Sequence, residues 1–151
     1  MSSSRFPAGA PVAGEDRSGD CAGPTSTGSD RPIRLLVVDD DARVRTAIAQ
    51  TVALEPDIII VAQADSAGVA RTLAERTELS VALVDVLLPD APTGLALVRS
   101  LDQRQGCAVV AMSVRGGLRG PALAAGAVAF VEKGSDIDAI LTAVRDAAST
   151  S

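Results

Sequence analysis

One carboxylate of this chain, Asp85, directly follows a short apolar run, and the apolar residues after it stop at Pro89. The run, residues 81–84, consists of small and branched residues, which suit a strand buried on both faces of a parallel sheet. An unpaired carboxylate inside such a strand would cost several kcal/mol. We therefore expect Asp85 at the carboxyl end of the strand, where an open α/β sheet has its ligand crevice. There it would be the reacting group of the protein.

Three consecutive acids, Asp39, Asp40 and Asp41, follow another apolar run in the same way. One interpretation is a helix N-terminus, where a carboxylate caps backbone amides and meets the positive end of the helix dipole. That explains one acid, Asp41 or Asp40, better than it explains all three. Adjacent carboxylates about 4 Å apart repel by ~4 kcal/mol at an effective dielectric constant of about 20, and a divalent cation would relieve this repulsion. We favour a metal site at the acid pair.

Ser113 and Lys133 follow two further apolar runs, and Lys133 is the only lysine beside thirteen arginines. Taken singly, such a serine is usually a cap and such a lysine is usually solvated. Their convergence with the acids at the ends of four different strands argues for one shared site. In parallel sheets these ends open into the same crevice.

Histidine is absent from the chain, which excludes several kinds of chemistry. Ser-His-Asp and Cys-His catalysis, a phosphohistidine relay within this chain and imidazole metal ligands are all ruled out. A metal bound here should therefore be a hard cation held by oxygen atoms, and Mg²⁺ is the usual choice beside phosphate.

Five apolar runs alternate with five segments of helical periodicity, which predicts a parallel sheet covered on both faces. The expected strands are residues 34–38, 58–62, 81–85, 108–112 and 127–131. The expected helices are residues 41–54, 66–76, 93–105 and 121–125, and a last one that begins at Ser135 or Asp136. Thr93 is the expected cap of the third helix, and Gly126 the expected end of the fourth.

Composition predicts a single domain with a tail at each end. Residues 1–32 are rich in Ser, Gly, Pro, Ala and Asp, and we expect a disordered tail there; we expect the domain at 33–148 and a short tail at 149–151. No secretory signal or membrane span is predicted, and a net charge of −5 without a basic cluster argues against nucleic-acid binding. Cys21 and Cys107 form no disulfide framework, which favours the cytoplasm.

Four motifs together resemble the receiver domain of two-component response regulators. They are Val-Val-Asp-Asp at residues 37–40, Leu-Val-Asp-Val-Leu-Leu-Pro at 83–89, Ala-Met-Ser at 111–113 and Ala-Gly-Ala-Val-Ala-Phe-Val-Glu-Lys at 125–133. The resemblance implies a flavodoxin-like (βα)5 fold with strand order 2-1-3-4-5. It also implies phosphoryl transfer from a histidine kinase to an aspartate, in a domain that catalyses only its own phosphotransfer and dephosphorylation.

Carried over by motif, the resemblance makes Asp85 the phosphoacceptor. It implies that Asp40 binds Mg²⁺ directly and Asp39 through water, together with Asp85 and the backbone carbonyl of Leu87. Ser113 matches the hydroxyl that moves to the phosphoryl group. Phe130 matches the aromatic residue that swings inward with it, and Lys133 matches the lysine that pairs with the phosphoryl oxygens.

This sequence departs from the usual receiver pattern in three places. The segment between Ser113 and Gly126 is short and contains three glycines and a proline, which implies a shortened fourth helix. Gly134 follows Lys133 where many receivers have proline, and this Lys-Gly pair is familiar from LuxR-type receivers. The loop from Asp85 to Gly94 is about one residue longer than is common.

Several partners and functions fit this sequence. The first is a receiver that docks to a downstream protein, with a homodimer as one form of the assembly. The second is the receiver half of a LuxR-type transcription factor whose output domain has been removed, and the third is a binding module that is never phosphorylated. A haloacid-dehalogenase-type phosphatase ranks last because Leu87 occupies the position of its second carboxylate. A dinucleotide-binding protein is disfavoured because no Gly-rich turn follows the first strand.

Overall fold

A computed structural model describes residues 31–104 and 106–150. The tail expected at residues 1–32 lies almost entirely outside these described residues. Five parallel strands form one sheet in the order β2-β1-β3-β4-β5, as the resemblance implied. The strands are β1 (Ile33–Val38), β2 (Ile58–Ala64), β3 (Val81–Asp85), β4 (Ala108–Ser113) and β5 (Ala129–Glu132).

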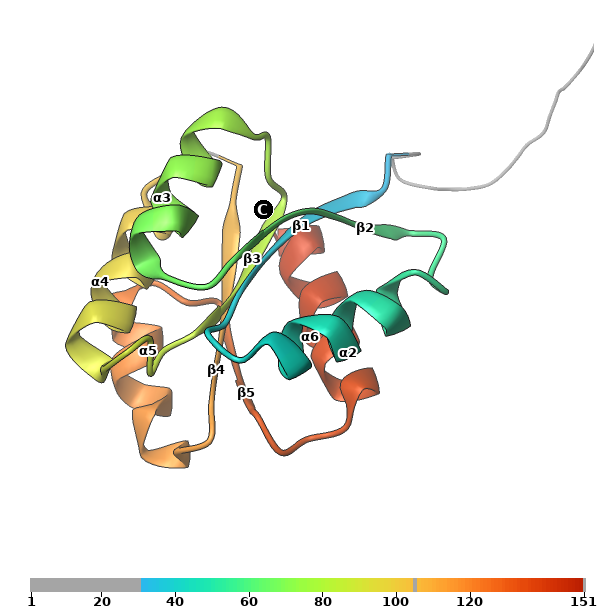
Figure 1. Cartoon of the computed structure of the whole chain (residues 1–151). Coiled ribbons are helices and arrows are strands. Elements are labelled where there is room, and N and C mark those ends of the chain that lie inside the picture. The colour runs from blue at the N-terminus through green and yellow to red at the C-terminus, as the bar shows by residue number, and fades with distance from the viewer. Residues whose placement is uncertain (1–30, 105, 151) are drawn as a thin grey trace, which may run out of the picture. The chain divides into compact units, whose positions relative to one another are not determined.

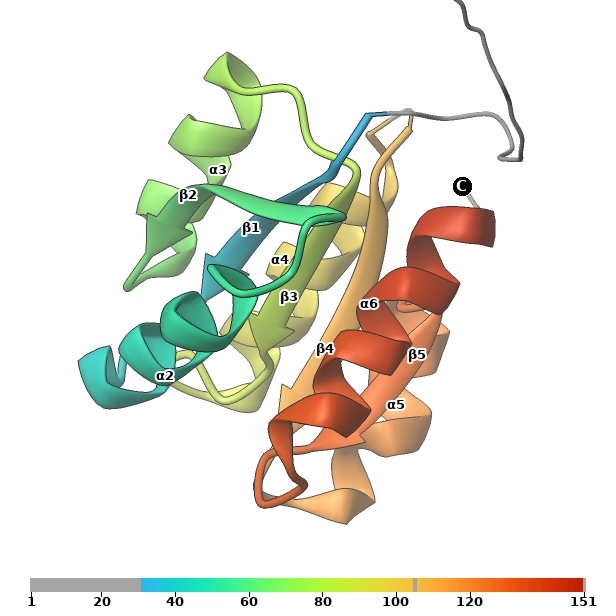
Figure 2. The same cartoon turned by 90° about the vertical axis from the view of Figure 1, so that its right-hand side faces the viewer.

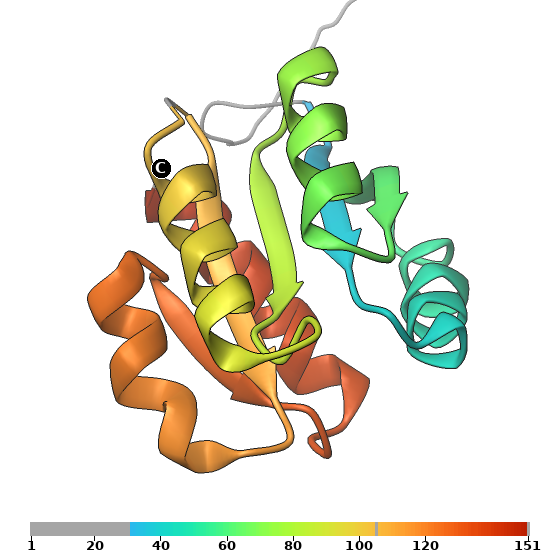
Figure 3. The same cartoon turned by 60° about the vertical axis from the view of Figure 1, so that its left-hand side comes forward.

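Helices cover both faces of the sheet, which confirms the flavodoxin-like architecture (Figures 1 and 2). They are α2 (Ala42–Val52), α3 (Ala67–Arg76), α4 (Ala91–Asp102), the 3₁₀ turn η2 (Gly116–Leu118), α5 (Arg119–Ala125) and α6 (Ile137–Thr150). Helices α2 and α6 lie on one face. Helices α3, α4 and α5 lie on the other face, side by side (Figure 3).

The central strands carry two hydrophobic cores, one on each face of the sheet. Leu36 and Val38 point into the core beneath α3, α4 and α5, whereas Leu35 and Val37 point into the core beneath α2 and α6. All of β3 and β4 is buried, because helices cover both of their faces. Each fully buried Val, Leu or Met side chain in these strands contributes about 1.5–3 kcal/mol relative to an exposed one. The sheet is therefore a rigid platform for the residues at its carboxyl edge.

Helix α4 begins earlier than the sequence suggested, so the expected cap at Thr93 is wrong. Asp90 is the N-cap, and its Oδ1 accepts a hydrogen bond of 2.9 Å from the Thr93 N–H. Pro92 is accommodated in the first helical turn, where no intrahelical N–H is needed. The helix also ends at Asp102, before the expected 105.

The fourth helix of the fold, α5, is short, as expected, although it begins earlier than residue 121. A 3₁₀ turn leads into a helix of seven residues that starts at Arg119. Pro121 again falls in a first turn, which explains why it does not prevent the helix. Gly126 ends the helix with φ +120°, a conformation that favours glycine.

The other boundaries differ by a few residues from those expected. Strand β2 continues to Ala64, and β5 runs from Ala129 to Glu132 rather than over 127–131. Helix α6 continues to Thr150, beyond the expected domain end at 148, so it includes two residues of the expected C-terminal tail. Among the described residues, no helix is both long enough and apolar enough to span a membrane.

Candidate functional site

The register of the strands brings the predicted site residues to the carboxyl edge of the sheet. Val38 of β1 is level with Val84 of β3, so the next residues, Asp39 and Asp85, lie beside each other. Asp85 is itself level with Met112 of β4, one residue before Ser113. The pairing of β4 with β5 continues into the loop, where the Lys133 N–H donates to the Ser113 carbonyl at 2.9 Å.

Lys133 bridges two buried carboxylates at this edge. Its Nζ lies 2.8 Å from Asp85 Oδ2 and 2.8 Å from Asp39 Oδ2. The Asp39 side chain is fully buried, that of Asp85 is 5% exposed, and that of Lys133 is 16% exposed. Lys133 donates a hydrogen bond to Asp85, but its approach to Asp39 Oδ2 is poorly aligned for one. Among the described residues, Asp39 Oδ2 thus has an ion-pair contact but no hydrogen-bond donor.

Burial and charge act in opposite directions on these groups. Burial raises the pKa of Asp39, and the contact with Lys133 only partly offsets this. Burial lowers the pKa of Lys133, but its contacts with Asp39 and Asp85 together outweigh that effect, and the net pKa is raised. Lys133 is therefore held in its charged form. For Asp39, the contact with Lys133 is not enough to offset the effect of burial on the pKa.

The acidic cluster suits a divalent cation. Asp39, Asp40 and Asp85 each offer a carboxylate oxygen, and these atoms lie within 4.8 Å of one another. Asp39 and Asp85 are buried and Asp40 is exposed, so the cluster is open to solvent on one side. Three carboxylates face one ammonium, and hard oxygen ligands of this kind fit Mg²⁺. The chemistry of the donor set thus agrees with the predicted metal site.

The backbone after Asp85 turns back toward its side chain. Asp85 Oδ1 accepts a hydrogen bond of 3.0 Å from the N–H of Leu87. The metal contact predicted for the Leu87 carbonyl remains a prediction. Gly94 of α4 packs directly against this loop, since a Cβ there would lie 1.8 Å from the Val86 carbonyl oxygen. Glycine is therefore required for α4 to approach the loop.

The two predicted switch residues lie beside this edge, and both are buried. The Ser113 side chain is fully buried, and its Oγ accepts a hydrogen bond of 3.0 Å from the Arg115 N–H. Phe130 is 8% exposed and belongs to the core beneath α3, α4 and α5. The hydroxyl is thus tied to the segment that leads into η2 and α5.

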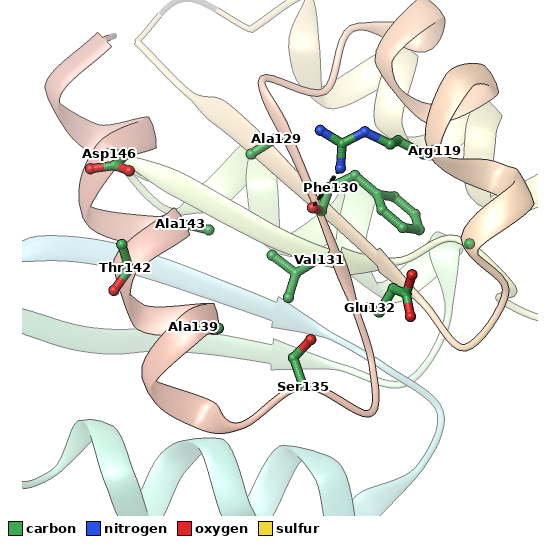
Figure 4. Close-up of a pocket in the computed structure, with 11 residues that line it drawn as sticks. Arg119, Ala129, Phe130, Val131, Glu132, Ser135, Ala139, Thr142, Ala143 and Asp146 are labelled. Carbon is green, nitrogen blue, oxygen red and sulfur yellow. Dashed lines mark hydrogen bonds between the residues drawn. The ribbon is translucent and has the colours of Figure 1, made fainter.

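Two cavities border α6. One, of about 420 Å³ between α2 and α6, is lined in part by Lys133. The other, of about 500 Å³, lies along β5 between α5 and α6 (Figure 4). There Arg119 Nη1 donates to the Phe130 carbonyl oxygen at 3.5 Å. This second cavity contains none of the predicted acids, so size alone does not identify the reactive site.

Sequence reasoning missed two contacts of Asp39. Its Oδ1 accepts a hydrogen bond of 2.8 Å from the N–H of Asp41, which is also the N-cap of α2. Its backbone carbonyl accepts a hydrogen bond from Arg45 Nη1. Nothing in the sequence separates Arg45 from the exposed Arg43 two residues before it.

A doubly wound sheet with buried acids and a lysine at its carboxyl edge defines a receiver-like class of signalling domain. The family model described as the response regulator receiver domain matches residues 35–145. The chain belongs to this family.

Known relatives agree with this assignment. The chain is 33% identical over 118 residues to the transcriptional regulatory protein UhpA of Escherichia coli, a match that covers 77% of this chain and 59% of UhpA. It is 39% identical over 64 residues to a protein-glutamate methylesterase/protein-glutamine glutaminase of Anaeromyxobacter dehalogenans, covering 42% of this chain and 19% of that protein. The chain thus spans less than two thirds of either relative.

Solved structures show the same fold. The signal receiver domain of the putative response regulator NarL from Mycobacterium tuberculosis has a TM-score of 0.70 and 28% identity, covering 80% of this chain and 99% of that one. A LuxR-family two-component response regulator from Aurantimonas sp. has a TM-score of 0.72 and 26% identity, covering 79% and 86%. The LuxR-type resemblance of the sequence is therefore confirmed.

Proposed function

We propose that Asp85 accepts a phosphoryl group from the phosphohistidine of a histidine kinase and that the aspartyl phosphate switches a protein-binding surface. The observation that carries this proposal is the Lys133 ammonium, placed 2.8 Å from both Asp39 and Asp85. A carboxylate can attack a phosphoryl group only where the repulsion between their negative charges is screened. This ammonium provides screening within the protein itself.

The transfer makes one bond and breaks one. An oxygen of Asp85 attacks phosphorus, a P–O bond forms as the P–N bond breaks, and the departing imidazole nitrogen keeps the bonding electron pair. Asp39 and Asp40 would hold Mg²⁺, with Asp85 and the Leu87 carbonyl. When bound, that ion neutralises charge on the phosphoryl oxygens. Lys133 orients and stabilises the same oxygens from the β5 side.

The phosphorylated domain would signal through neighbouring elements. Ser113 would turn from the Arg115 N–H toward the phosphoryl group, which would free the backbone before η2. The Phe130 side chain would then swing inward together with the Ser113 hydroxyl. A bias of a few kcal/mol between two states of this surface suffices for a switch. The downstream partner would dock on this surface. We place the docking in the cytoplasm because two cysteines, Cys21 and Cys107, are too few for a disulfide framework.

A second candidate function is supported by the relatives. UhpA is a transcriptional regulatory protein, and this chain spans 59% of its length. The same phosphoryl switch would then control a LuxR-type output domain, and the chain itself would make no contact with DNA.

Intact-mass measurement after incubation with acetyl phosphate and Mg²⁺ tests the proposal. We expect a gain of one phosphoryl group in the wild type and in Glu75→Gln, an exposed acid on α3 that serves as the control. We expect no gain in Asp85→Asn. A gain that survives Asp85→Asn would overturn the assignment, as would failure with both acetyl phosphate and a panel of histidine kinases.

A further inference from the structure

Arg45 reaches back from α2 to the strand end that carries the acid pair. Its Nη1 donates a hydrogen bond to the backbone carbonyl of Asp39. Arg45 is half-buried, whereas Arg43 on the same helix has a side chain that is 93% exposed. The two arginines therefore differ in what they do, although they are two residues apart.

The contact with Arg45 completes the fixation of Asp39. The Asp39 N–H donates to the Ala64 carbonyl at 3.0 Å, its Oδ1 accepts from Asp41, and its Oδ2 contacts Lys133. The backbone carbonyl is the remaining polar group, and Arg45 binds it. Three polar groups of Asp39 are thus hydrogen-bonded, and the fourth, Oδ2, has the ion-pair contact with Lys133.

Asp40 is held very differently. It is exposed, and within residues 31–104 and 106–150 its carboxylate has no hydrogen bond or ion pair. Its position depends on the backbone that precedes it. The Asp39 carbonyl and the Asp40 nitrogen belong to one planar peptide unit, so a group that holds the carbonyl also fixes the plane from which Asp40 projects.

We propose that Arg45 is a positioning residue for the acid pair: it locks the peptide between Asp39 and Asp40 and thereby directs the Asp40 carboxylate toward a divalent cation. The inference rests on the proposed function, because that function gives the acid pair its metal. Arg45 acts through Asp40, since its own hydrogen bond goes to the backbone.

An alternative role for Arg45 predicts the opposite result. If only its charge mattered, Arg45 would repel a cation at the neighbouring carboxylates, and its removal would strengthen Mg²⁺ binding. If Arg45 positions Asp40, its removal weakens binding because Asp40 then samples directions that do not face the cation. The sign of the change therefore distinguishes the two roles.

Mg²⁺ affinity can be measured without any phosphodonor. The chain lacks Trp and Tyr, so the suitable methods are titration calorimetry and the amide NMR shifts of residues 39–41 and 85–87. We expect Arg45→Gln to weaken Mg²⁺ binding about 5–10-fold, which corresponds to roughly 1–1.4 kcal/mol. Arg45→Lys keeps the charge but loses the planar fork, and we expect it to restore part of the affinity.

Arg43→Gln is the matched control, because it removes the same charge from the same helix without touching the Asp39 carbonyl. It breaks the exposed ion pair of Arg43 with Asp41 but leaves the Asp41 N–H on Asp39 Oδ1. We expect it to leave Mg²⁺ affinity unchanged or slightly higher. If Arg45→Gln does not fold, Arg45→Lys decides between the two roles. A positioning role predicts weaker Mg²⁺ binding than in the wild type, whereas a pure charge effect predicts no change in affinity.

Three outcomes would overturn the role of Arg45. These are unchanged binding in Arg45→Gln, tighter binding in Arg45→Gln, and a wild type that binds no Mg²⁺. The proposed function fails separately, through a wild type that binds Mg²⁺ but is never phosphorylated on Asp85.

Discussion

Lys133 holds Asp39 and Asp85 at the same distance, with Nζ 2.8 Å from an oxygen of each. A single ammonium thus stands between two buried carboxylates that β1 and β3 place side by side. This arrangement neutralises only part of their charge, and removal of the ammonium would leave the acids to repel each other in a poorly solvated place.

Replacement of Lys133 by Met should therefore lower stability in Mg²⁺-free buffer and increase the affinity for Mg²⁺. The loss should be about 1–3 kcal/mol, because buried carboxylates that lose their partner are costly. Added Mg²⁺ should restore more stability to the variant than to the wild type, since a ligand that binds only the folded state stabilises it. Thermal unfolding with and without Mg²⁺ measures this; equal stabilisation of the two proteins would contradict it. Phosphorylation of the variant should be slow in spite of the tighter metal binding, because no ammonium remains to orient the phosphoryl oxygens.

Gly94→Ala should destabilise the fold strongly. Its Cβ would lie 1.8 Å from the Val86 carbonyl oxygen, so α4 or the loop that follows Asp85 would have to move. We expect a loss of about 3 kcal/mol or more in urea unfolding, at the upper end of the usual cost of overpacking. Gly68→Ala is the matched control, since nothing lies within 4 Å of its Cβ position in α3. It should stabilise the protein by about 0.5–1 kcal/mol. Equal effects at the two positions would refute the close approach of α4.

A surface cluster joins α6 to the loop between α2 and β2. Arg145 Nε lies 2.7 Å from Asp57 Oδ2, its Nη2 lies 3.0 Å from Asp57 Oδ1, and Nη2 also contacts Glu55. The hydrogen bond from Arg145 is the main reason that the pKa of Asp57 is lowered from its usual 3.8. Arg145→Gln should lower stability by about 1 kcal/mol at neutral pH, because these side chains are partly exposed.

The cost of Arg145→Gln should also depend on pH. A lowered pKa in the folded state contributes stability above the unfolded pKa, and that stability disappears as the pH falls through the folded pKa. The difference in the free energy of unfolding between the wild type and the variant should therefore be constant above pH 5. It should become smaller below pH 3.8, where Asp57 takes up a proton. Urea unfolding across this range measures the difference, and a gap that widens at low pH would rule out the ion pair as its cause.

The fold and the acidic edge were predictable from sequence because both follow from short, local patterns. Apolar runs that end in Asp85 or in the Asp39–Asp41 run are visible in the sequence, and parallel strands must bring their carboxyl ends together. Helix limits were less predictable, since Asp90 and Thr93 are both acceptable caps, and the sequence alone does not show that Asp90 accepts from the Thr93 N–H. The hydrogen bond from Arg45 could not be predicted, because it depends on the direction of a single long side chain.

The Ser113 hydroxyl is hydrogen-bonded to the segment that leads into η2 and α5, and we predict that Ser113→Ala separates phosphorylation from its structural consequence. In the unphosphorylated structure its Oγ accepts a hydrogen bond from the Arg115 N–H, so its loss should cost about 1 kcal/mol of stability. Asp85 keeps its own partners, Leu87 and Lys133, in this variant, and we expect it to be phosphorylated at close to the wild-type rate. The amide NMR shifts of residues 114–132 should then change much less on phosphorylation than they do in the wild type, because no hydroxyl moves toward the phosphoryl group. Ser113→Thr keeps the hydroxyl and should restore most of the response. If Ser113→Ala shows the full wild-type pattern of shifts, the signal leaves Asp85 by another route, for which the loop that Gly94 supports is the nearest candidate.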